Sequence, residues 1–275
     1  MPEQRRNVFF ISDGTGITAE TLGHSLLVQF EGMSFTQEKL PFIDSVAKAE
    51  ECRGRLEESL RTTGTRPIVF STLVDSAARE TLRNSDALVL DFFEHFLDPL
   101  EAEFQSKSTH TIGRGHTEAG NQEYQDRIEA INFALAHDDG LAHLDLHTAD
   151  VILIGVSRSG KTPTCLYMAL QLGIKAANCP LIPEDFERDA LPEALQPHVK
   201  KLFGLTITPD RLTQIRNERR PGSKYASIEN CRYEIGAADA LMKRHSIPTL
   251  NSTTKSIEEI ATKILQEIKL QRRVY

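Results

Sequence analysis

Short apolar runs separated by amphipathic segments mark the first half of the chain. Three of these runs have the continuous apolar character of strands buried on both faces: Val8–Ile11, Arg66–Ser71 and Ala87–Asp91. After the first run, apolar residues recur at helical spacing at Leu22, Leu26, Leu27 and Phe30. Strands of this kind that alternate with helices predict a parallel sheet covered on both faces.

The middle of the chain interrupts this alternation. Residues 103–122 contain few apolar side chains, which predicts a long loop. A helical pattern returns over Tyr124–Ala136, and the sequence Asp138-Asp139-Gly140 ends it. We therefore expect a domain boundary close to residue 144.

The second half repeats the strand-to-helix pattern. Val151–Ile154 predicts a strand, and a helix follows over Thr162–Leu172 with Gly173 as its stop. Further strands are predicted at Leu202–Ile207 and Pro248–Leu250.

The last predicted element is an amphipathic helix over Ser256–Leu265, where Ser256 and Glu259 fit a capping box. The whole pattern predicts an α/β protein of two domains. An N-terminal parallel-sheet α/β domain is expected at residues 1–144, and a P-loop kinase-like α/β domain at residues 145–275.

A glycine-rich segment between the strand at 151–154 and the following helix matches G-x-x-x-x-G-K-[ST] at every fixed position. It consists of Gly155, Val156, Ser157, Arg158, Ser159, Gly160, Lys161 and Thr162. Such a loop directs backbone N–H groups at phosphate oxygens, and the helix N-terminus adds positive potential. We expect Lys161 to reach the terminal phosphate and Thr162 to offer its hydroxyl to Mg²⁺. Arg158 is a candidate for stabilising transition-state charge.

A second loop of small residues follows the first predicted strand. Asp13, Gly14, Thr15 and Gly16 could cradle another phosphate or a phosphorylated group of the substrate. Turns between a strand and a helix often have this composition, so the sequence leaves both interpretations open.

The acid that would hold the magnesium water shell is not decided by the sequence. Asp13 and Asp91 end apolar strands, and Asp210 follows a later one. Asp150 precedes the strand of the glycine loop, at the far end from the phosphates, and we include it as a candidate catalytic residue. The segment Gly113-Arg114-Gly115-His116 offers further groups for proton transfer or phosphate binding.

Composition and charge narrow the classes of function. The net charge of −7 argues against a nucleic-acid binder that relies on general phosphate attraction. No apolar run approaches the roughly 20 residues that span a bilayer, and the first one is too short for a signal peptide, so we expect a cytoplasmic protein without a membrane contact. The four cysteines have no metal-type spacing and are expected in the core.

Three separate motifs together resemble one family. Val8–Thr21, the segment Tyr124–Ile131 with His137–Gly140, and Gly155–Pro163 are similar to the pyruvate dikinase regulatory proteins, and most similar to the branch that regulates bacterial phosphoenolpyruvate synthase. The resemblance extends from the N-terminus to the helix at 256–264.

The resemblance implies a bifunctional serine/threonine protein kinase and phosphorylase whose protein partner is phosphoenolpyruvate synthase. ADP would be the phosphoryl donor to a threonine of the synthase, which inactivates it. Inorganic phosphate would be the co-substrate that removes the group and releases pyrophosphate. Eukaryotic-type kinase signatures are absent from the sequence, as the family leads us to expect.

Other functions remain open at this point. The same activities could be directed at pyruvate, phosphate dikinase, or the chain could be a small-molecule P-loop kinase or a non-catalytic nucleotide sensor. The sequence also leaves the oligomeric state open, a homo-oligomer included.

Overall fold

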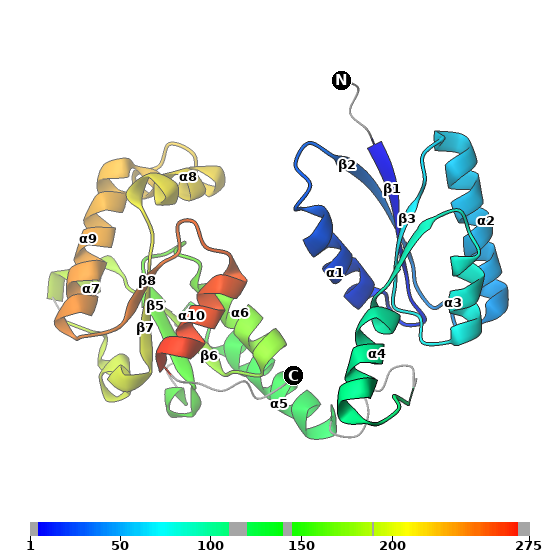
Figure 1. The fold of residues 1–275 in the computed structure, drawn as a ribbon. Coiled ribbons are helices and arrows are strands. Elements are labelled where there is room, and N and C mark those ends of the chain that lie inside the picture. Colours follow the sequence, from blue (N-terminus) through cyan, green and yellow to red (C-terminus); the bar gives the residue numbers. More distant parts are fainter. Residues whose placement is uncertain (1–4, 110–119, 140–144, 189, 269–275) are drawn as a thin grey trace. The chain divides into compact units, whose positions relative to one another are not determined.

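The computed structural model describes residues 5–109, 120–139, 145–188 and 190–268. The chain divides into two compact units, residues 1–117 and 118–275. Each unit contains one four-stranded sheet whose neighbouring strands are all parallel (Figure 1). The predicted fold of two α/β domains, the first with a parallel sheet, is therefore confirmed, and the sheet of the second unit is parallel as well.

The first unit alternates strands and helices. Its elements are β1 (Arg5–Ile11), α1 (Ile17–Leu27), β2 (Ser34–Leu40), α2 (Val46–Thr63), β3 (Ile68–Ser71), α3 (Ser76–Arg83), β4 (Leu88–Asp91) and α4 (Phe92–Phe104). The strand order is β2-β1-β3-β4, so the apolar strand β1 lies inside the sheet and the polar strand β2 lies at its edge.

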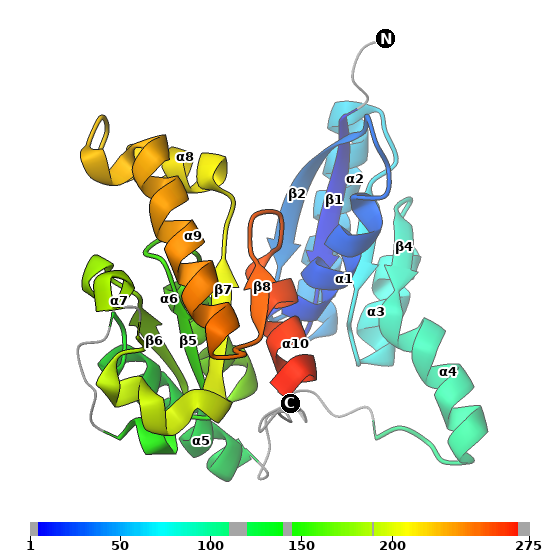
Figure 2. The same cartoon turned by 90° about the vertical axis from the view of Figure 1, so that its left-hand side faces the viewer.

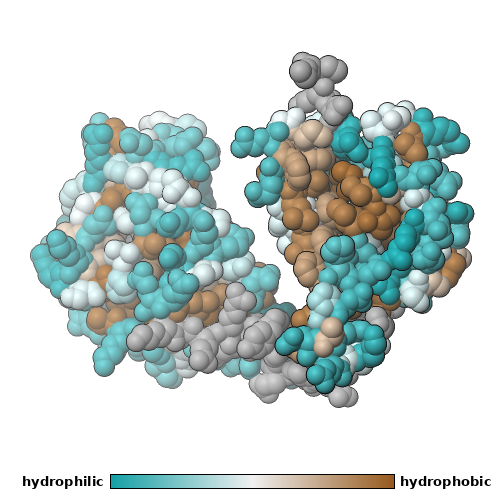
Figure 3. Space-filling view, in the orientation of Figure 1, coloured by the Kyte–Doolittle hydropathy of each residue, from teal (hydrophilic) through white to brown (hydrophobic). Residues whose placement is uncertain are grey.

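Helices cover both faces of this sheet. Side chains of α2 and α3 pack on one face in a cluster that contains Cys52, Leu56 and Leu82. On the other face Phe10 stacks on Phe70 with ring centroids 5.7 Å apart, beneath α1. The outer side of α1 and the turn after it expose large apolar residues, Ile17, Leu22, Leu26, Val28 and Phe30. Figure 3 shows apolar side chains gathered on one face of this unit, which therefore presents an apolar surface as well as polar loops.

The second unit begins with a helix and then repeats the alternation. Its elements are α5 (Gly120–Ala136), the 3₁₀ turn η2 (Leu146–Thr148), β5 (Val151–Gly155), α6 (Lys161–Leu172), β6 (Ala176–Pro180), α7 (Pro183–Arg188), η3 (Glu193–Lys201), β7 (Leu202–Thr206), α8 (Pro209–Arg219), η4 (Lys224–Ala226), α9 (Ile228–Arg244), β8 (Thr249–Asn251) and α10 (Ile257–Ile268). The strand order β6-β5-β7-β8 matches that of the first unit, because in each the first strand lies between the second and the third.

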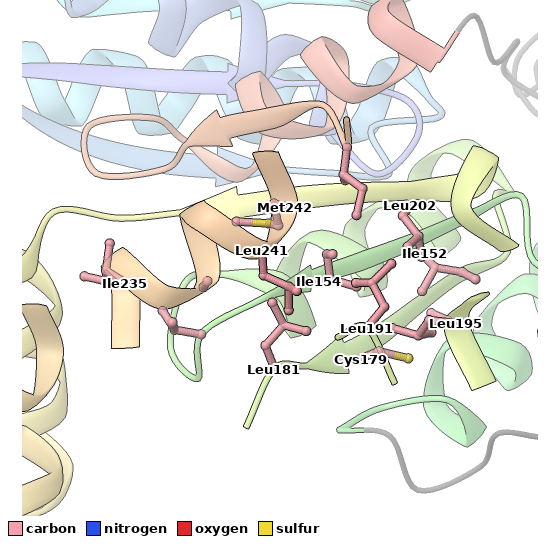
Figure 4. Close-up of a cluster of buried hydrophobic side chains, with 14 of the residues drawn as sticks. Ile152, Ile154, Cys179, Leu181, Leu191, Leu195, Leu202, Ile235, Leu241 and Met242 are labelled. Atoms are coloured by element: carbon pink, nitrogen blue, oxygen red, sulfur yellow. The ribbon is translucent and has the colours of Figure 1, made fainter. Parts of the chain in front are cut away.

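The core of the second unit is also divided by its sheet. Figure 4 shows one side, where Ile152 and Ile154 of β5 meet Ile235, Leu241 and other apolar residues of α9. The opposite side packs Cys165 and Met168 of α6 with Ile260 of α10. Figure 2 shows these elements from a second direction. Three layers therefore hold β5, and with it the glycine-rich loop, in the centre of the unit.

The division between the units differs from the predicted boundary at 144/145. Helix α5 belongs to the second unit, where Ala130 and Ala134 pack against Ala169 of α6. At its end, the His137 carbonyl accepts a hydrogen bond of 2.9 Å from the Asn178 N–H on β6. Alanines let the two helices approach closely, and this packing ties α5 to the sheet that follows it rather than to the one before it.

Candidate functional site

The glycine-rich loop joins β5 to α6, as the motif requires. Gly155, Arg158 and Gly160 have φ values of +141°, +75° and +95°, a region that L side chains rarely adopt. A Cβ at Gly155 would lie 2.2 Å from the carbonyl oxygen of Leu205 on β7. Glycine at 155 is thus needed for the close approach of two strands, whereas Arg158 holds a strained backbone at the loop crest.

Lys161 is the first residue of α6 and is almost completely buried, with 4% of its surface exposed. Its Nζ donates a hydrogen bond of 2.8 Å to the Val156 carbonyl oxygen, so the side chain crosses the loop from its end to its beginning. Burial lowers the pKa of Lys161 to about 8, while the carboxylates of Asp139 and Asp138 oppose that change. At neutral pH the ammonium is therefore still mainly charged and is available to an anion in the loop.

Two carboxylates face the loop from the segment after α5. Asp138 Oδ1 accepts hydrogen bonds from Thr162 Oγ1 at 2.9 Å and from Asn178 Nδ2 at 2.6 Å. The same amide group is 3.2 Å from Asp139 Oδ1. Asn178 lies on β6 and is 1% exposed, so it is a fixed support for the acid pair. The fold thus brings two acids to the lysine and the threonine of the motif.

A buried arginine fixes the crest of the loop from the other side. Arg216 of α8 has no exposed surface and donates to the carbonyl oxygens of Ser157 at 3.1 Å and Tyr225 at 3.0 Å. It also forms an ion pair of 2.6 Å with Glu234, and its guanidinium lies 4.0 Å from the ring centroid of Tyr225. The Tyr225 hydroxyl is 3.0 Å from Ser157 Oγ. Helices α8 and α9 therefore set the position of Ser157.

These groups surround a cavity of about 700 Å³. The volume lies within the range of small-molecule binding sites. Its lining residues are Asp138, Asp139, Ser157, Arg158, Gly160, Lys161, Thr162, Pro163, Asn178, Ile215, Arg219, Arg220 and Tyr225. Four of these side chains are basic and two are acidic, so the lining favours an anion of more than one negative charge.

Most of the predicted loop residues meet at this cavity. Ser157, Arg158, Gly160, Lys161 and Thr162 line it. Val156 and Ser159 are 1% exposed and, like Gly155, belong to the buried base of the loop rather than to the lining.

Asp150 does not meet these residues. It precedes β5, at the end of the strand opposite to the glycine loop, and its Oδ2 accepts a hydrogen bond of 2.9 Å from the Lys175 N–H. This position makes its carboxylate a support for the start of β6, so the geometry does not support the predicted catalytic role.

The other candidate acids also lie elsewhere. Asp13 and Asp91 both belong to the first unit, where Asp91 caps α4 through a hydrogen bond from the Glu94 N–H. Asp210 lies in the first turn of α8 and does not line the cavity. The residues 113–116 fall outside the described part of the chain. From the sequence, Asp138 and Asp139 were predicted only as a helix stop and as part of the family motif. Two consecutive acids followed by glycine were the available signal.

The second predicted loop, at Asp13–Gly16, joins β1 to α1 in the first unit. Asp13 Oδ2 accepts a hydrogen bond of 2.7 Å from the Val74 N–H, and burial raises the pKa of this carboxyl group. The Gly14 N–H donates to Ser12 Oγ at 3.1 Å. Gly16 caps α1 with a φ of +77°, and Thr15 is exposed. The loop has the expected strand-to-helix position, but part of its hydrogen-bonding capacity is used within the unit.

The oxygen groups at the cavity fit a hard cation that arrives with a phosphate. Thr162 supplies a hydroxyl, and Asp138 and Asp139 supply carboxylates, which are the ligands that Mg²⁺ takes together with water and phosphate oxygens. Within the described residues, no cluster of three or more His, Cys, Asp or Glu side chains could hold a metal by itself. A magnesium ion here would therefore depend on the ligand for part of its coordination.

The four cysteines are free and buried, as predicted. In the part of the chain that the structure describes, no helix is both long and apolar enough to cross a membrane.

Comparison with known proteins agrees with the motifs. The family model described as kinase/pyrophosphorylase matches residues 8–265. A protein of Aromatoleum aromaticum named "putative phosphoenolpyruvate synthase regulatory protein" is 62% identical over 271 residues, which cover 98% of each chain. Proteins of the same name from Cupriavidus pinatubonensis and Burkholderia multivorans are 60% and 61% identical over 98% of this chain, and over 89% and 98% of their own lengths. The chain belongs to the kinase/pyrophosphorylase family.

Proposed function

We propose that this chain is a bifunctional phosphotransferase that regulates phosphoenolpyruvate synthase. In one direction it transfers a phosphoryl group from ADP to a threonine of the synthase and inactivates it. In the other it uses inorganic phosphate to remove that group, releases pyrophosphate and restores activity. The family and the names of the relatives support the class of reaction and the protein partner.

One observation carries the proposal: a single cavity combines the motif lysine and threonine with two carboxylates. The loop N–H groups and Lys161 hold the phosphates of ADP. The β-phosphate of ADP reaches far enough to contact Lys161, so the γ-phosphate of ATP is not required. Asp138, which accepts a hydrogen bond from Thr162, would be the acid that supports Mg²⁺. When bound, this ion supplies charge neutralisation for the phosphates.

Asp139 serves as the general base. Its carboxylate lines the cavity and accepts a long hydrogen bond of 3.2 Å from the Asn178 amide, whereas Asp138 accepts two shorter ones, so Asp139 is the freer acid of the pair. The threonine Oγ attacks the β-phosphorus of ADP and gives its proton to Asp139, while the bond from that phosphorus to the bridging oxygen breaks and AMP leaves. In the reverse activity an oxygen of inorganic phosphate attacks the phosphothreonine phosphorus, and the departing threonine Oγ takes up a proton.

Both directions use one anion site at Lys161. Inorganic phosphate takes the place of the ADP β-phosphate in the glycine loop, since the chain has one complete motif of this kind. If Lys161→Ala abolished the kinase but left phosphate-dependent dephosphorylation intact, this sharing would be disproved.

The loop at Asp13–Gly16 binds the second phosphate-bearing participant, such as the phosphohistidine of the synthase. Its position after the central strand β1 and before α1 supports this assignment. Replacing Gly14 and Gly16 by alanine should raise the KM for the protein substrate and leave ADP affinity unchanged. Unaltered kinetics for the protein substrate would count against it.

The deciding experiment is incubation with phosphoenolpyruvate synthase or with pyruvate, phosphate dikinase in the presence of phosphoenolpyruvate and either ADP or ATP. We expect ADP-dependent phosphate on a threonine near the catalytic histidine of the synthase, located by phosphosite mapping. Transfer to the dikinase alone would change the partner, and transfer to neither protein would overturn the proposal.

A further inference from the structure

The lining of the cavity contains an arginine pair that the proposed function leaves unused. Arg219 is the last residue of α8 and Arg220 is its C-cap, and both line the cavity. Neither side chain forms a hydrogen bond or an ion pair with any described residue. An arginine without a carboxylate partner at a cavity wall keeps its whole fork of N–H donors for a ligand.

The end of α8, which carries the arginine pair, is tied to the glycine loop. Arg216 lies one helical turn before Arg219 on α8, and it is the residue that donates to the Ser157 carbonyl and pairs with Glu234. A single buried side chain therefore connects the loop crest to the end of the helix that carries the pair. This connection fixes the backbone that carries the pair relative to the glycine loop, as a site for two linked phosphates needs.

The lining also contains more basic side chains than one phosphate at Lys161 would contact. The acids Asp138 and Asp139 face four basic side chains, of which Arg158, Arg219 and Arg220 are separate from the buried lysine. A phosphate in the loop uses Lys161 and the backbone N–H groups. The N–H donors of Arg158, Arg219 and Arg220 then remain for other groups of the ligand, which favours a second tetrahedral anion beside the first.

We propose that Arg219 and Arg220 form a second anion subsite that binds the phosphate monoester of the phosphorylated protein substrate while inorganic phosphate occupies the glycine loop. The inference rests on the proposed function and identifies where the phosphate of the phosphothreonine binds, which is distinct from the phosphohistidine assigned to the loop at Asp13–Gly16. Pyrophosphate, in which the two phosphates are joined, would occupy both subsites at once. A single inorganic phosphate would occupy only the loop.

Equilibrium binding tests this arrangement without any turnover. Pyrophosphate, inorganic phosphate and ADP are titrated calorimetrically into the full chain and into Arg219→Gln/Arg220→Gln. We expect the double variant to lose about 10- to 100-fold in pyrophosphate affinity, the range for lost hydrogen bonds to charged groups. Its affinities for inorganic phosphate and ADP should change less than about threefold.

Lys243→Gln is the matched control. Lys243 also lies in the last turn of a helix, α9, and lines a different cavity, so its loss removes a charge and a dipole contact away from the glycine loop. It should leave all three affinities unchanged. An equal loss for pyrophosphate and inorganic phosphate, an equal loss in the control, or no loss in the double variant would each overturn the subsite.

Kinetics of the phosphate-dependent reaction show whether the arginine pair binds the phosphate of the phosphorylated synthase or inorganic phosphate. The double variant should raise the KM for the phosphorylated synthase at least about tenfold and leave the KM for inorganic phosphate within about threefold. A raised KM for inorganic phosphate alone would reverse the assignment and overturn it. Absence of ADP binding by the unaltered chain would instead refute the proposed function, whereas ADP binding with no difference for pyrophosphate refutes only the subsite.

Discussion

The first strand-to-helix loop of each unit has the same place in the same strand order, yet the two loops differ in chemistry. The loop after β5 ends in the buried Lys161, which crosses it, and opens on a cavity of about 700 Å³. The loop after β1 has no lysine between Ser12 and Gly16, and its Asp13 is bonded to the Val74 N–H. Topology thus provides a location for an anion, and the residues of the loop decide which phosphate group is held there and how strongly.

The largest effect should come from the lysine that distinguishes the loops. Lys161→Ala removes the buried cation that faces the phosphates, and we expect kcat/KM for ADP-dependent transfer to fall about 10³-fold. Lys39→Ala is the control in the first unit, where Lys39 lies beside Gly16 and pairs with Glu20 at 2.5 Å. It should change the ADP reaction less than about threefold. Comparable losses in both variants would remove the distinction between the loops.

Asp138 of the second unit and Asp13 of the first should also differ in their effect on the ADP reaction. Asp138→Asn keeps an acceptor for Thr162 but removes the negative charge, so phosphoryl transfer should fall about 10²-fold when measured at saturating ADP. Asp13→Asn keeps the acceptor for the Val74 N–H and should leave ADP-dependent transfer within about threefold. Thermal unfolding of both variants checks that each remains folded. A stronger effect at Asp13 would place the acid of the ADP reaction in the first unit.

Glycine substitutions compare the packing of the loops. A Cβ at Gly155 collides with backbone on β7, and we expect Gly155→Ala to lower the free energy of unfolding by at least about 3 kcal/mol. Gly160→Ala has the strained φ but nothing within 4 Å, so it should cost about 1–2 kcal/mol. Gly16→Ala meets only the flexible end of Lys39 at 3.2 Å and should cost about the same. Urea unfolding measures all three, and equal costs would contradict the role of the close strand contact.

The pH dependence of ADP binding should report the burial of Lys161. With a pKa of about 8, the free protein loses this charge as pH rises through 8, so ADP affinity should fall about tenfold between pH 7 and pH 9. Because burial lowers the folded pKa below 10.5, the unfolded chain binds the extra proton between about pH 8 and 10.5. The contribution of Lys161 to stability therefore rises with pH across that window. Lys161→Arg stays charged and should abolish the fall in affinity; a fall that persists in this variant would assign it to another group.

The smallest effect is expected at Asp150. Its Oδ2 accepts from the Lys175 N–H, and an asparagine can accept the same bond, so Asp150→Asn should change kcat/KM less than about threefold. A loss as large as that of Asp138→Asn would restore the predicted catalytic role.

Local signals in the sequence were sufficient for the elements around the glycine loop. The strand β5, the loop and the helix α6 with its Gly173 stop were predicted from one continuous stretch, and the structure confirms their positions. The capping box of α10 is also confirmed, since Ser256 and Glu259 exchange hydrogen bonds of 2.9 and 3.2 Å. These features depend on neighbours in the chain, which a sequence pattern records.

Features that depend on distant contacts were missed. The edge strand β2 has the half-exposed polar sequence Ser34–Leu40, and β6 consists of small residues that carry no strand signal. The predicted loop at residues 103–122 begins as the end of α4, and its residues 110–119 lie outside the described chain. Asp138 and Asp139 reach the site because Asn178, which is forty residues from Asp138, bonds to both. Spacing along the chain does not contain that contact.

Each sheet is built from one uninterrupted stretch of chain, with strands at residues 5–91 in the first unit and 151–251 in the second. During synthesis the first unit can therefore complete its sheet before any strand of the second has left the ribosome. Helix α5 emerges next, followed directly by the two aspartates, but β5 and β6, which will pack beside them, have not yet been synthesised. The two acids of the site are thus synthesised before the glycine loop, and they gain their final position only when β5 and β6 dock beside α5.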